Sequence, residues 1–321
     1  MNPYIGHEKQ LYGVTEMRLC GGKAEGMRLL HVQNGKGLDF FISVDRCADI
    51  SELSFKGDNF GYFAPCGYVA PAYYQEPGNG FLKSFTAGFF TTCGLTAVGT
   101  PCLDAGEELP LHGTVSNIPA ERVSYYVNGD SIHIDADIRD AALFSRKLLL
   151  SRHYEISLTK NEIVLTDTIK NMGSEESPLE VLYHCNMGYP LLSENAVLSI
   201  PTEGVTARNS HAQEGIRDWQ KVEKPQKGYE EMCFYHQLSG KAEISLYNPD
   251  IKKGLIMSYD TKNLPYFTQW KMMGEVEYVL GLEPGNCLPD GRSVMREQGK
   301  LEFLAPGAEK VHQITFTFTE E

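Results

Sequence analysis

Turn-forming residues divide the whole sequence into short segments, and this limits the possible folds more than any other feature. The 321 residues include 31 glycines and 16 prolines. Between them, apolar and polar side chains mostly alternate, whereas a helix would repeat its apolar positions every three to four residues. Alternation is typical of strands with one buried face. The sequence therefore predicts an all-β protein.

Several segments pair across short turns and predict β-hairpins. The predicted pairs are residues 29–33 with 38–44, 123–127 with 131–138, and 152–158 with 162–169. An Asn-Gly step begins the first two turns and supplies positive φ values at little cost. Further strands are predicted at residues 242–247, 254–259, 277–282 and 311–319. Strands at this spacing, without long helices between them, favour a large antiparallel β-sandwich over a parallel α/β sheet.

Two longer stretches interrupt the predicted strands. Residues 60–90 are rich in Gly, Pro and aromatic side chains. They are too apolar for a flexible tether, so they predict a long ordered loop on one face. Residues 209–231 are polar and predict an irregular or partly helical loop. Since neither stretch is a linker, we expect residues 1–321 to form a single domain.

The chain is acidic, and this excludes some classes of partner. Its formal net charge is −13 and its pI is near 5.2. Nucleic acids and anionic membranes would both require a basic face. The first residues lack the layout of a signal peptide, and no apolar run reaches the roughly 20 residues of a membrane helix. We expect a cytoplasmic monomer or homodimer that binds a small molecule, with no nucleic acid or membrane partner.

The sequence contains no recognisable metal or cofactor motif. The eight cysteines include no Cys-x-x-Cys pair, so neither a disulfide framework nor a thiolate zinc site is indicated. His133, Asp135 and Asp137 alternate along one predicted strand and are interpreted as its polar solvent face. There is no complete phosphate-binding loop and no Gly-x-Ser-x-Gly elbow. We therefore expect no metal and no cofactor.

Three residues are candidates for acid/base chemistry. Glu283 ends an apolar run just before Pro284-Gly285, where a strand would hold a carboxylate rigidly and partly remove it from water. His112 and His184 lie in similarly punctuated places. One Glu with two His, without a nucleophile motif, suggests acid/base catalysis on a neutral polar substrate. The alternatives are a surface ion pair for Glu283, a hydrogen-bonded core position for His184 and a turn for His112.

Four motifs occur in an order that is characteristic of one family. They are His112-Gly113, residues 183–189 (Tyr-His-Cys-Asn-Met-Gly-Tyr), Leu282-Glu283-Pro284 followed by Pro289-Asp290, and residues 304–308 before a final Thr/Phe strand. With this set the chain resembles the aldose 1-epimerase (galactose mutarotase-like) superfamily. Residues 44–50 and 88–99 resemble its branch that carries a domain of unknown function.

The resemblance implies a fold, an activity and residue roles. The fold is a large antiparallel β-supersandwich, and the activity is interconversion of the α and β anomers of a free sugar or sugar derivative. His184 is then the general acid for the ring oxygen, Glu283 the general base for the anomeric hydroxyl, and His112 a hydrogen-bonding group nearby. The superfamily has Asn before its second histidine, whereas here Tyr183 precedes His184 and Asn186 follows it. This difference concerns sugar specificity.

Further residues are predicted to bind the carbohydrate. Arg46 and Asp49 either contact sugar hydroxyls or pair with each other, since a guanidinium offers a fixed fork of donors. In Gln269-Trp270-Lys271, the indole either packs against a pyranose or belongs to the core. Asn186 completes the set. The rival functions are a non-catalytic sugar-binding or sugar-sensing protein, and a lyase or hydrolase with a further carboxylate or Tyr in the cleft.

Overall fold

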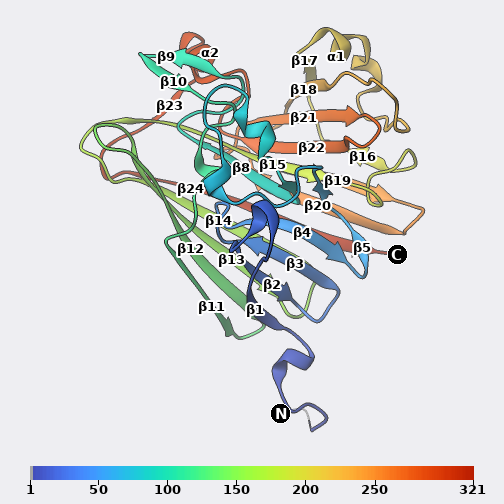
Figure 1. Cartoon of the computed structure of the whole chain (residues 1–321). Coiled ribbons are helices and arrows are strands. Elements are labelled where there is room, and N and C mark those ends of the chain that lie inside the picture. Colours follow the sequence, from blue (N-terminus) through green and yellow to red (C-terminus); the bar gives the residue numbers. More distant parts are fainter. Residues whose placement is uncertain (1–2) are drawn as a thin grey trace.

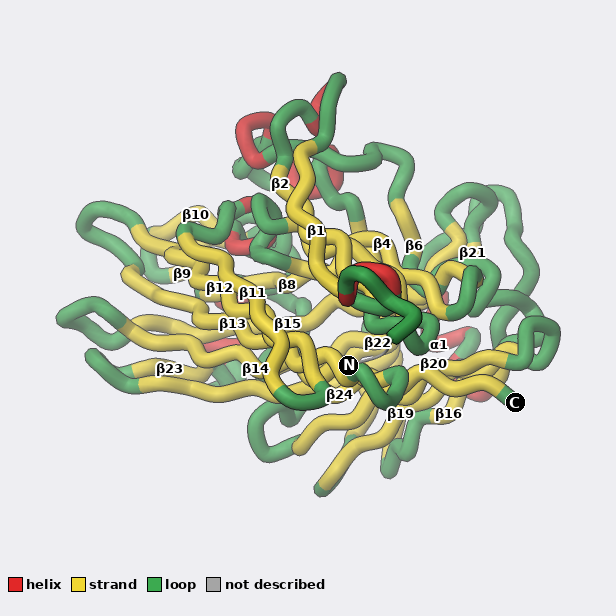
Figure 2. Tube along the Cα trace, turned by 90° about the horizontal axis from the view of Figure 1, so that it is seen from below, coloured by secondary structure: helices red, strands yellow, loops and turns green. Residues whose placement is uncertain are grey.

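The fold is built almost entirely from antiparallel strands. The structure, a computed structural model, describes residues 3–321. Its α-helices within this range are α1 (Ser210–Glu214) and α2 (Arg292–Glu297), and the trace in Figure 2 consists mainly of strands and loops. No helix of residues 3–321 is long and apolar enough to cross a membrane. The all-β, antiparallel prediction is confirmed.

The largest sheet has eight strands, in the order β11-β12-β13-β14-β24-β20-β19-β16. Their bounds, in that order, are Arg122–Asn128, Ser131–Ala141, Lys147–Ser157, Glu162–Asn171, Glu309–Glu320, Lys253–Asp260, Lys241–Asn248 and Val197–Ser199. The β11–β12 and β13–β14 pairs are two of the predicted hairpins. The last strand of the chain, β24, lies between β14 and β20 and so joins two parts of the sequence.

The second sheet carries the candidate site. It has the order β17-β18-β21-β22-β15-β23, and β8 pairs with β15 beside this path. The bounds are Gly204–Ala207, Met232–Gln237, Tyr266–Met273, Tyr278–Gly285, Ser177–Met187 and Glu302–Leu304, with β8 at Phe90–Leu95. In Figure 1, β21 and β22 are the orange strands at the upper right.

Smaller sheets complete the structure. The N-terminal sheet, blue in Figure 1, has the order β1-β2-β3-β4-β5. It contains the remaining predicted hairpin, β2–β3. Its strands are Gly13–Arg18, Arg28–Gln33, Leu38–Ser43, Asp49–Phe55 and Asp58–Asn59. Two small pairs are β6 (Tyr62–Phe63) with β7 (Ala87–Gly88), and β9 (Cys102–Asp104) with β10 (Glu107–Leu109).

The core lies where the inner faces of these sheets meet. Along β12, Ile132, Ile134, Ala136 and Ile138 are buried, while the residues that alternate with them are more exposed. From β24, the ring of Phe316 contacts those of Phe89 and Phe90 at centroid distances of 5.1 and 6.2 Å. This alternation is why these strands were predictable from sequence.

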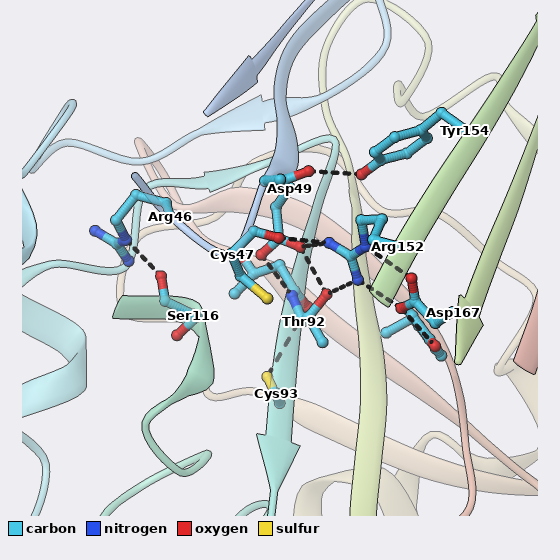
Figure 3. Close-up of polar contacts among 12 residues, drawn as sticks. Arg46, Cys47, Asp49, Thr92, Cys93, Ser116, Arg152, Tyr154 and Asp167 are labelled. Carbon is cyan, nitrogen blue, oxygen red and sulfur yellow. Dashed lines mark hydrogen bonds and ion pairs between the residues drawn. The ribbon is translucent and has the colours of Figure 1, made fainter. Parts of the chain in front are cut away.

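One charged side chain crosses this apolar core. Arg152 of β13 is fully buried, and all five of its N–H groups donate hydrogen bonds (Figure 3). Two go to the Asp167 carboxylate of β14 at 2.9 and 2.7 Å. The others reach Asp49 Oδ1 at 2.5 Å, the Cys47 carbonyl at 2.9 Å and Thr92 Oγ1 at 2.8 Å. Arg152 therefore links strands of all three large sheets.

Replacing Arg152 is expected to destabilise the fold strongly. Arg152→Met keeps much of the side-chain volume but leaves the carboxylates of Asp49 and Asp167 buried without their cation. Breaking a buried pair in this way costs about 3–5 kcal/mol of unfolding free energy. The matched control is Arg139→Met, since Arg139 pairs with Glu121 on the surface and should contribute much less. Chemical denaturation measures both, and equal losses would contradict the assigned role of Arg152.

Candidate active site

The register of three neighbouring strands brings the predicted acid and base together. In the β21–β22 pair, Thr268 lies opposite Glu283. In the β15–β22 pair, Cys185 lies opposite Leu282, so His184 falls opposite Glu283. Residues in such cross-strand pairs project from the same face of a sheet. His184 Nε2 accordingly lies 3.4 Å from Glu283 Oε1.

These side chains line a cavity of about 340 Å³. Its size falls in the range of small-molecule sites. The lining residues are Asn79, Phe81, Leu82, Phe85, Gly99, Thr100, Pro101, Leu111, His112, His184, Arg208, Glu231, Cys233, Thr268, Trp270, Glu283 and Pro289. Four residues named from the sequence therefore meet here: His112, His184, Trp270 and Glu283. No group of three or more His, Cys, Asp or Glu side chains within residues 3–321 is arranged to hold a metal ion.

Aromatic rings surround the imidazole of His184. Phe85 and Trp270 each meet it edge to face, with centroid distances of 5.2 and 5.3 Å. His112 lies 5.6 Å away by the same measure and is itself in contact with Phe81. This packing leaves His184 only 5% exposed. The loop at residues 60–90 provides the two phenylalanines, which is how the predicted ordered loop contributes to the site.

Burial changes the ionisation of the acid/base pair. It raises the pKa of Glu283 well above its usual value, with the charge of Glu231 acting in the same direction and that of Arg208 opposing it. Burial lowers the pKa of His184 to about 4, although the nearby Asn186 amide opposes this change. Both shifts have one physical cause, because each charged form loses its hydration. They favour a neutral carboxyl beside a neutral imidazole, so the pair holds one proton.

His112 is held in place by its main chain. Its φ is +58°, in the left-handed region that few residues other than glycine adopt. Its N–H donates to the Gly99 carbonyl at 3.0 Å, and its carbonyl accepts from Gly94 N–H at 3.1 Å. Burial lowers the pKa of His112 to about 3, and the positive charge of Arg208, together with that of His184 whenever it is protonated, acts in the same direction. His112 is therefore a neutral imidazole fixed at the cavity wall.

Gly281 provides the space that the Glu283 side chain occupies. Glycine and glutamate are two positions apart on β22 and so share a face. A Cβ atom at position 281 would overlap Glu283 Oε1 and would lie 3.0 Å from Trp270 Cβ. The Gly-Leu-Glu order at this strand end therefore has a steric cause.

The structure places two neighbours of Trp270, Gln269 and Lys271, outside the cavity lining, whereas the sequence predicted that both bind the carbohydrate. Along β21, successive side chains point to opposite faces, so Thr268 and Trp270 line the cavity while Gln269 and Lys271 do not. The Gln269 amide donates to the Trp219 carbonyl at 2.9 Å. Lys271 Nζ donates to the Lys221 carbonyl at 2.7 Å and pairs with Glu223. The Gln269 amide and the Lys271 ammonium group thus have their polar partners on the face of β21 that is turned away from the cavity.

Arg46, Asp49 and Asn186 are also absent from the cavity lining. The buried Arg46 guanidinium donates to three main-chain carbonyls, those of Ser116, Val69 and Ser84. Asp49 pairs with Arg152 instead of Arg46. Asn186 is fully buried, and its amide donates to the His184 carbonyl at 2.7 Å. These residues shape the structure around the site, whereas the sequence predicted contacts to substrate.

Five polar residues of the cavity lining were missed from the sequence: Asn79, Thr100, Arg208, Glu231 and Thr268. Arg208 Nε donates to Asp290 at 3.0 Å, and its Nη2 donates to Thr100 Oγ1 at 2.8 Å. The Trp270 indole N–H donates to Glu231 Oε2 at 2.7 Å, which fixes the orientation of the ring. In the sequence, the Pro289-Asp290 motif was the signal that could have indicated Arg208, because Asp290 accepts a hydrogen bond from its guanidinium.

A comparison with models of known protein families shows the family of this chain. A family model described as a domain of unknown function, DUF4432, matches residues 24–318. The chain belongs to this family. No curated protein matches the sequence.

Solved structures show the same fold. A candidate aldose 1-epimerase from Klebsiella pneumoniae subsp. pneumoniae superposes with a TM-score of 0.91 at 26% identity, over 98% of this chain and 86% of that one. A galactose mutarotase-like protein from Clostridium acetobutylicum gives 0.71 at 15%, over 97% and 100%. Galactose 1-epimerase from Lactobacillus acidophilus NCFM gives 0.61 at 11%, over 96% and 99%. The chain therefore has the galactose mutarotase-like β-sandwich fold that its motifs predicted.

The ionisation of the cavity histidines can be measured directly. NMR of the imidazole nitrogens should find His112 and His184 neutral at pH 5.5, because burial disfavours their cations. Histidines of the unfolded chain have pKa values of about 6.5. Below that pH the unfolded state binds more protons than the folded state, so each buried neutral histidine lowers the unfolding free energy as the pH decreases. His112→Asn should therefore reduce the loss of stability between about pH 6.5 and pH 4. An imidazolium at either position at pH 5.5 would contradict the assignment.

A methyl group at position 281 is expected to displace the base. Gly281→Ala should lower the unfolding free energy by about 1–3 kcal/mol, as overpacking does, and should move Glu283 away from His184. The matched control is Gly274→Ala, because the nearest atom to a Cβ there is the flexible end of the Met272 side chain, at 3.1 Å. Denaturation and a crystal structure of each variant test this. Unchanged stability and geometry in Gly281→Ala would refute the steric argument.

Proposed function

We propose that the protein is an aldose-1-epimerase-like mutarotase that interconverts the anomers of a free sugar or sugar derivative. The observation that supports this most directly is the buried pair of His184 Nε2 and Glu283 Oε1, 3.4 Å apart on one cavity wall. The cavity volume of about 340 Å³ suits a monosaccharide. Membership of the DUF4432 family and the mutarotase-like fold agree with the proposal.

The proposed reaction is a transfer of protons in two opposite directions. Glu283 removes the proton from the anomeric hydroxyl O1, and His184 delivers a proton to the ring oxygen. The bond between C1 and the ring oxygen then breaks, leaving an open-chain aldehyde. Rotation about C1–C2 presents the other face of the carbonyl, and the reverse transfers close the ring. Since an acid and a base each contribute about 10²–10⁴-fold in such reactions, the pair can account for a useful rate.

The ionisation of the pair supports this assignment. The reactive form is a carboxylate beside an imidazolium, and it arises when the single proton of the pair moves from Glu283 to His184. After ring opening Glu283 is protonated and His184 is neutral. This is also the form that burial favours in the free enzyme, so the pair is back in its resting protonation state when the open-chain intermediate has formed.

Other cavity residues have roles consistent with sugar binding. Trp270, fixed by Glu231, offers an aromatic wall for the apolar face of a pyranose. His112 is neutral and its Nδ1 has no hydrogen-bond partner among the described residues. It can therefore bind a hydroxyl without introducing a charge. Glu231 is a second carboxylate in the cavity, but one of its oxygens already accepts from the Trp270 indole.

Replacement of the base and the acid separates catalysis from binding. Glu283→Gln keeps the size of the side chain but cannot accept the O1 proton, so anomerisation should fall by about 10²-fold or more while sugar affinity persists. His184→Asn should behave alike, and the double variant should lose little more than either single one, because each step needs both groups. NMR exchange between anomers across a panel of aldoses provides the rates, measured against the buffer background.

The wild-type protein is the control that decides between the proposed and the rival function. A protein that binds an aldose of the panel without accelerating its anomerisation would be a sugar-binding or sugar-sensing protein. Gln269→Ala is the matched variant on the neighbouring strand β21, since its side chain is not part of the cavity lining. It should leave the rate per folded molecule close to that of wild type.

A further inference from the structure

A buried hydroxyl stands beside the proposed base without a partner of its own. Thr268 of β21 lies opposite Glu283, lines the cavity and is only 1% exposed. Its Oγ1 makes no hydrogen bond to any described residue, and Glu283 Oε1, which lies 3.4 Å from His184 Nε2, makes none either. Buried polar groups nearly always have a partner, so two unpaired ones side by side at a cavity wall indicate a binding site for a shared ligand atom.

Another threonine of the same row shows the usual arrangement. Thr91 of β8 lies opposite His184, on the side away from Glu283, and is also buried. Its hydroxyl donates to the Ala87 carbonyl at 2.8 Å, and it does not line the cavity. The row of side chains across these strands therefore has a satisfied hydroxyl at one end and an unsatisfied hydroxyl next to the base.

We propose that Thr268 and Glu283 together bind the anomeric hydroxyl of the sugar. The Thr268 hydroxyl donates a hydrogen bond to O1, and the O1 hydroxyl donates its own proton toward Glu283. A sugar hydroxyl can accept and donate at once, so one oxygen satisfies both side chains. The inference rests on the proposed mutarotase function and adds a catalytic residue that contacts the reacting oxygen.

The Thr268 contact persists through ring opening. When the O1 proton moves to Glu283, O1 gains negative charge and then becomes the carbonyl oxygen of the aldehyde. It keeps lone pairs for Thr268 throughout, and a donor aimed at developing charge favours the transition state over the ground state. The pair also requires a free hydroxyl at C1. The substrate class is therefore a reducing sugar and not a glycoside, whose O1 has no proton to donate.

Two ligands and three variants test the proposal. The ligands are the aldose of the panel that wild type anomerises fastest and its 1,5-anhydroalditol, which is the same ring without O1. Thr268→Val replaces the hydroxyl by a methyl group of similar size, Thr268→Ser keeps it, and Thr91→Val is the matched control. Calorimetric titration measures affinity for each ligand, and NMR exchange measures kcat and KM.

The expected result is a loss confined to the ligand that has O1. In Thr268→Val, kcat/KM should fall by about 10–100-fold and aldose affinity by about 5–10-fold, as for removal of one hydrogen-bond donor. Its affinity for the anhydroalditol should equal that of wild type. Thr268→Ser should keep most of the activity, and Thr91→Val should not discriminate between the two ligands. Thr268→Ala replaces the Val variant if the latter does not fold.

The outcomes separate this inference from the function on which it rests. If wild type anomerises an aldose and Thr268→Val retains its kcat/KM, the role of Thr268 is wrong while the mutarotase function stands. Equal weakening of both ligands would also overturn it, because a purely structural defect acts on both. If wild type anomerises no aldose of the panel, the proposed function and this inference fail together.

Discussion

The Arg152 guanidinium is the interaction on which the arrangement of the sheets depends. A fully buried cation is tolerated only when it is paired and hydrogen-bonded, and its five N–H groups find those partners on strands from three sheets. The network continues into the site-bearing sheet, because the Tyr183 hydroxyl donates to Asp167 at 2.9 Å. Tyr183 and His184 are neighbours on β15 and face opposite sides. The strand that carries the proposed acid is thus held by a hydrogen bond on the face opposite to the cavity.

The sequence predicted several strands whose two faces differ, and it missed β8 and β15, whose faces are alike. β12, β13 and β14 alternate between buried and more exposed residues, so their pattern is visible. Nearly all of β15 and all of β8 are buried on both faces, and they therefore show no alternation. The site followed the same logic. His112, His184 and Glu283, which the motifs indicated, line the cavity, whereas Gln269 and Lys271 do not, because they lie on the other face of β21 from Trp270. Arg208 and Phe81 come from distant segments that only the fold brings together.

The cavity combines buried ionisable groups with polar atoms that have no hydrogen-bond partner within residues 3–321, and both oppose stability. Desolvation of His184 and Glu283 makes their charged forms unfavourable, because it raises the pKa of the carboxyl and lowers the pKa of the imidazole. The single proton of the pair therefore rests on Glu283, and the proposed ring opening begins when it moves to His184. The rings of Phe85 and Trp270 pack around His184, and several polar atoms at the wall have no hydrogen-bond partner among the described residues. Burial of apolar side chains in the core offsets the free-energy cost of these buried polar groups.

The pairing of β15 with β22 also restricts how this family can vary in length. His184 and Glu283 face the same cavity only while their strands keep the present alignment. An insertion or deletion of one residue within either strand would turn one of the two side chains into the interior. The same change in the short connection between β21 and β22, at residues 274–277, would leave the alignment intact. Length variation compatible with function should therefore be found in the connections, and the distance along the chain from each motif to its strand end should stay constant.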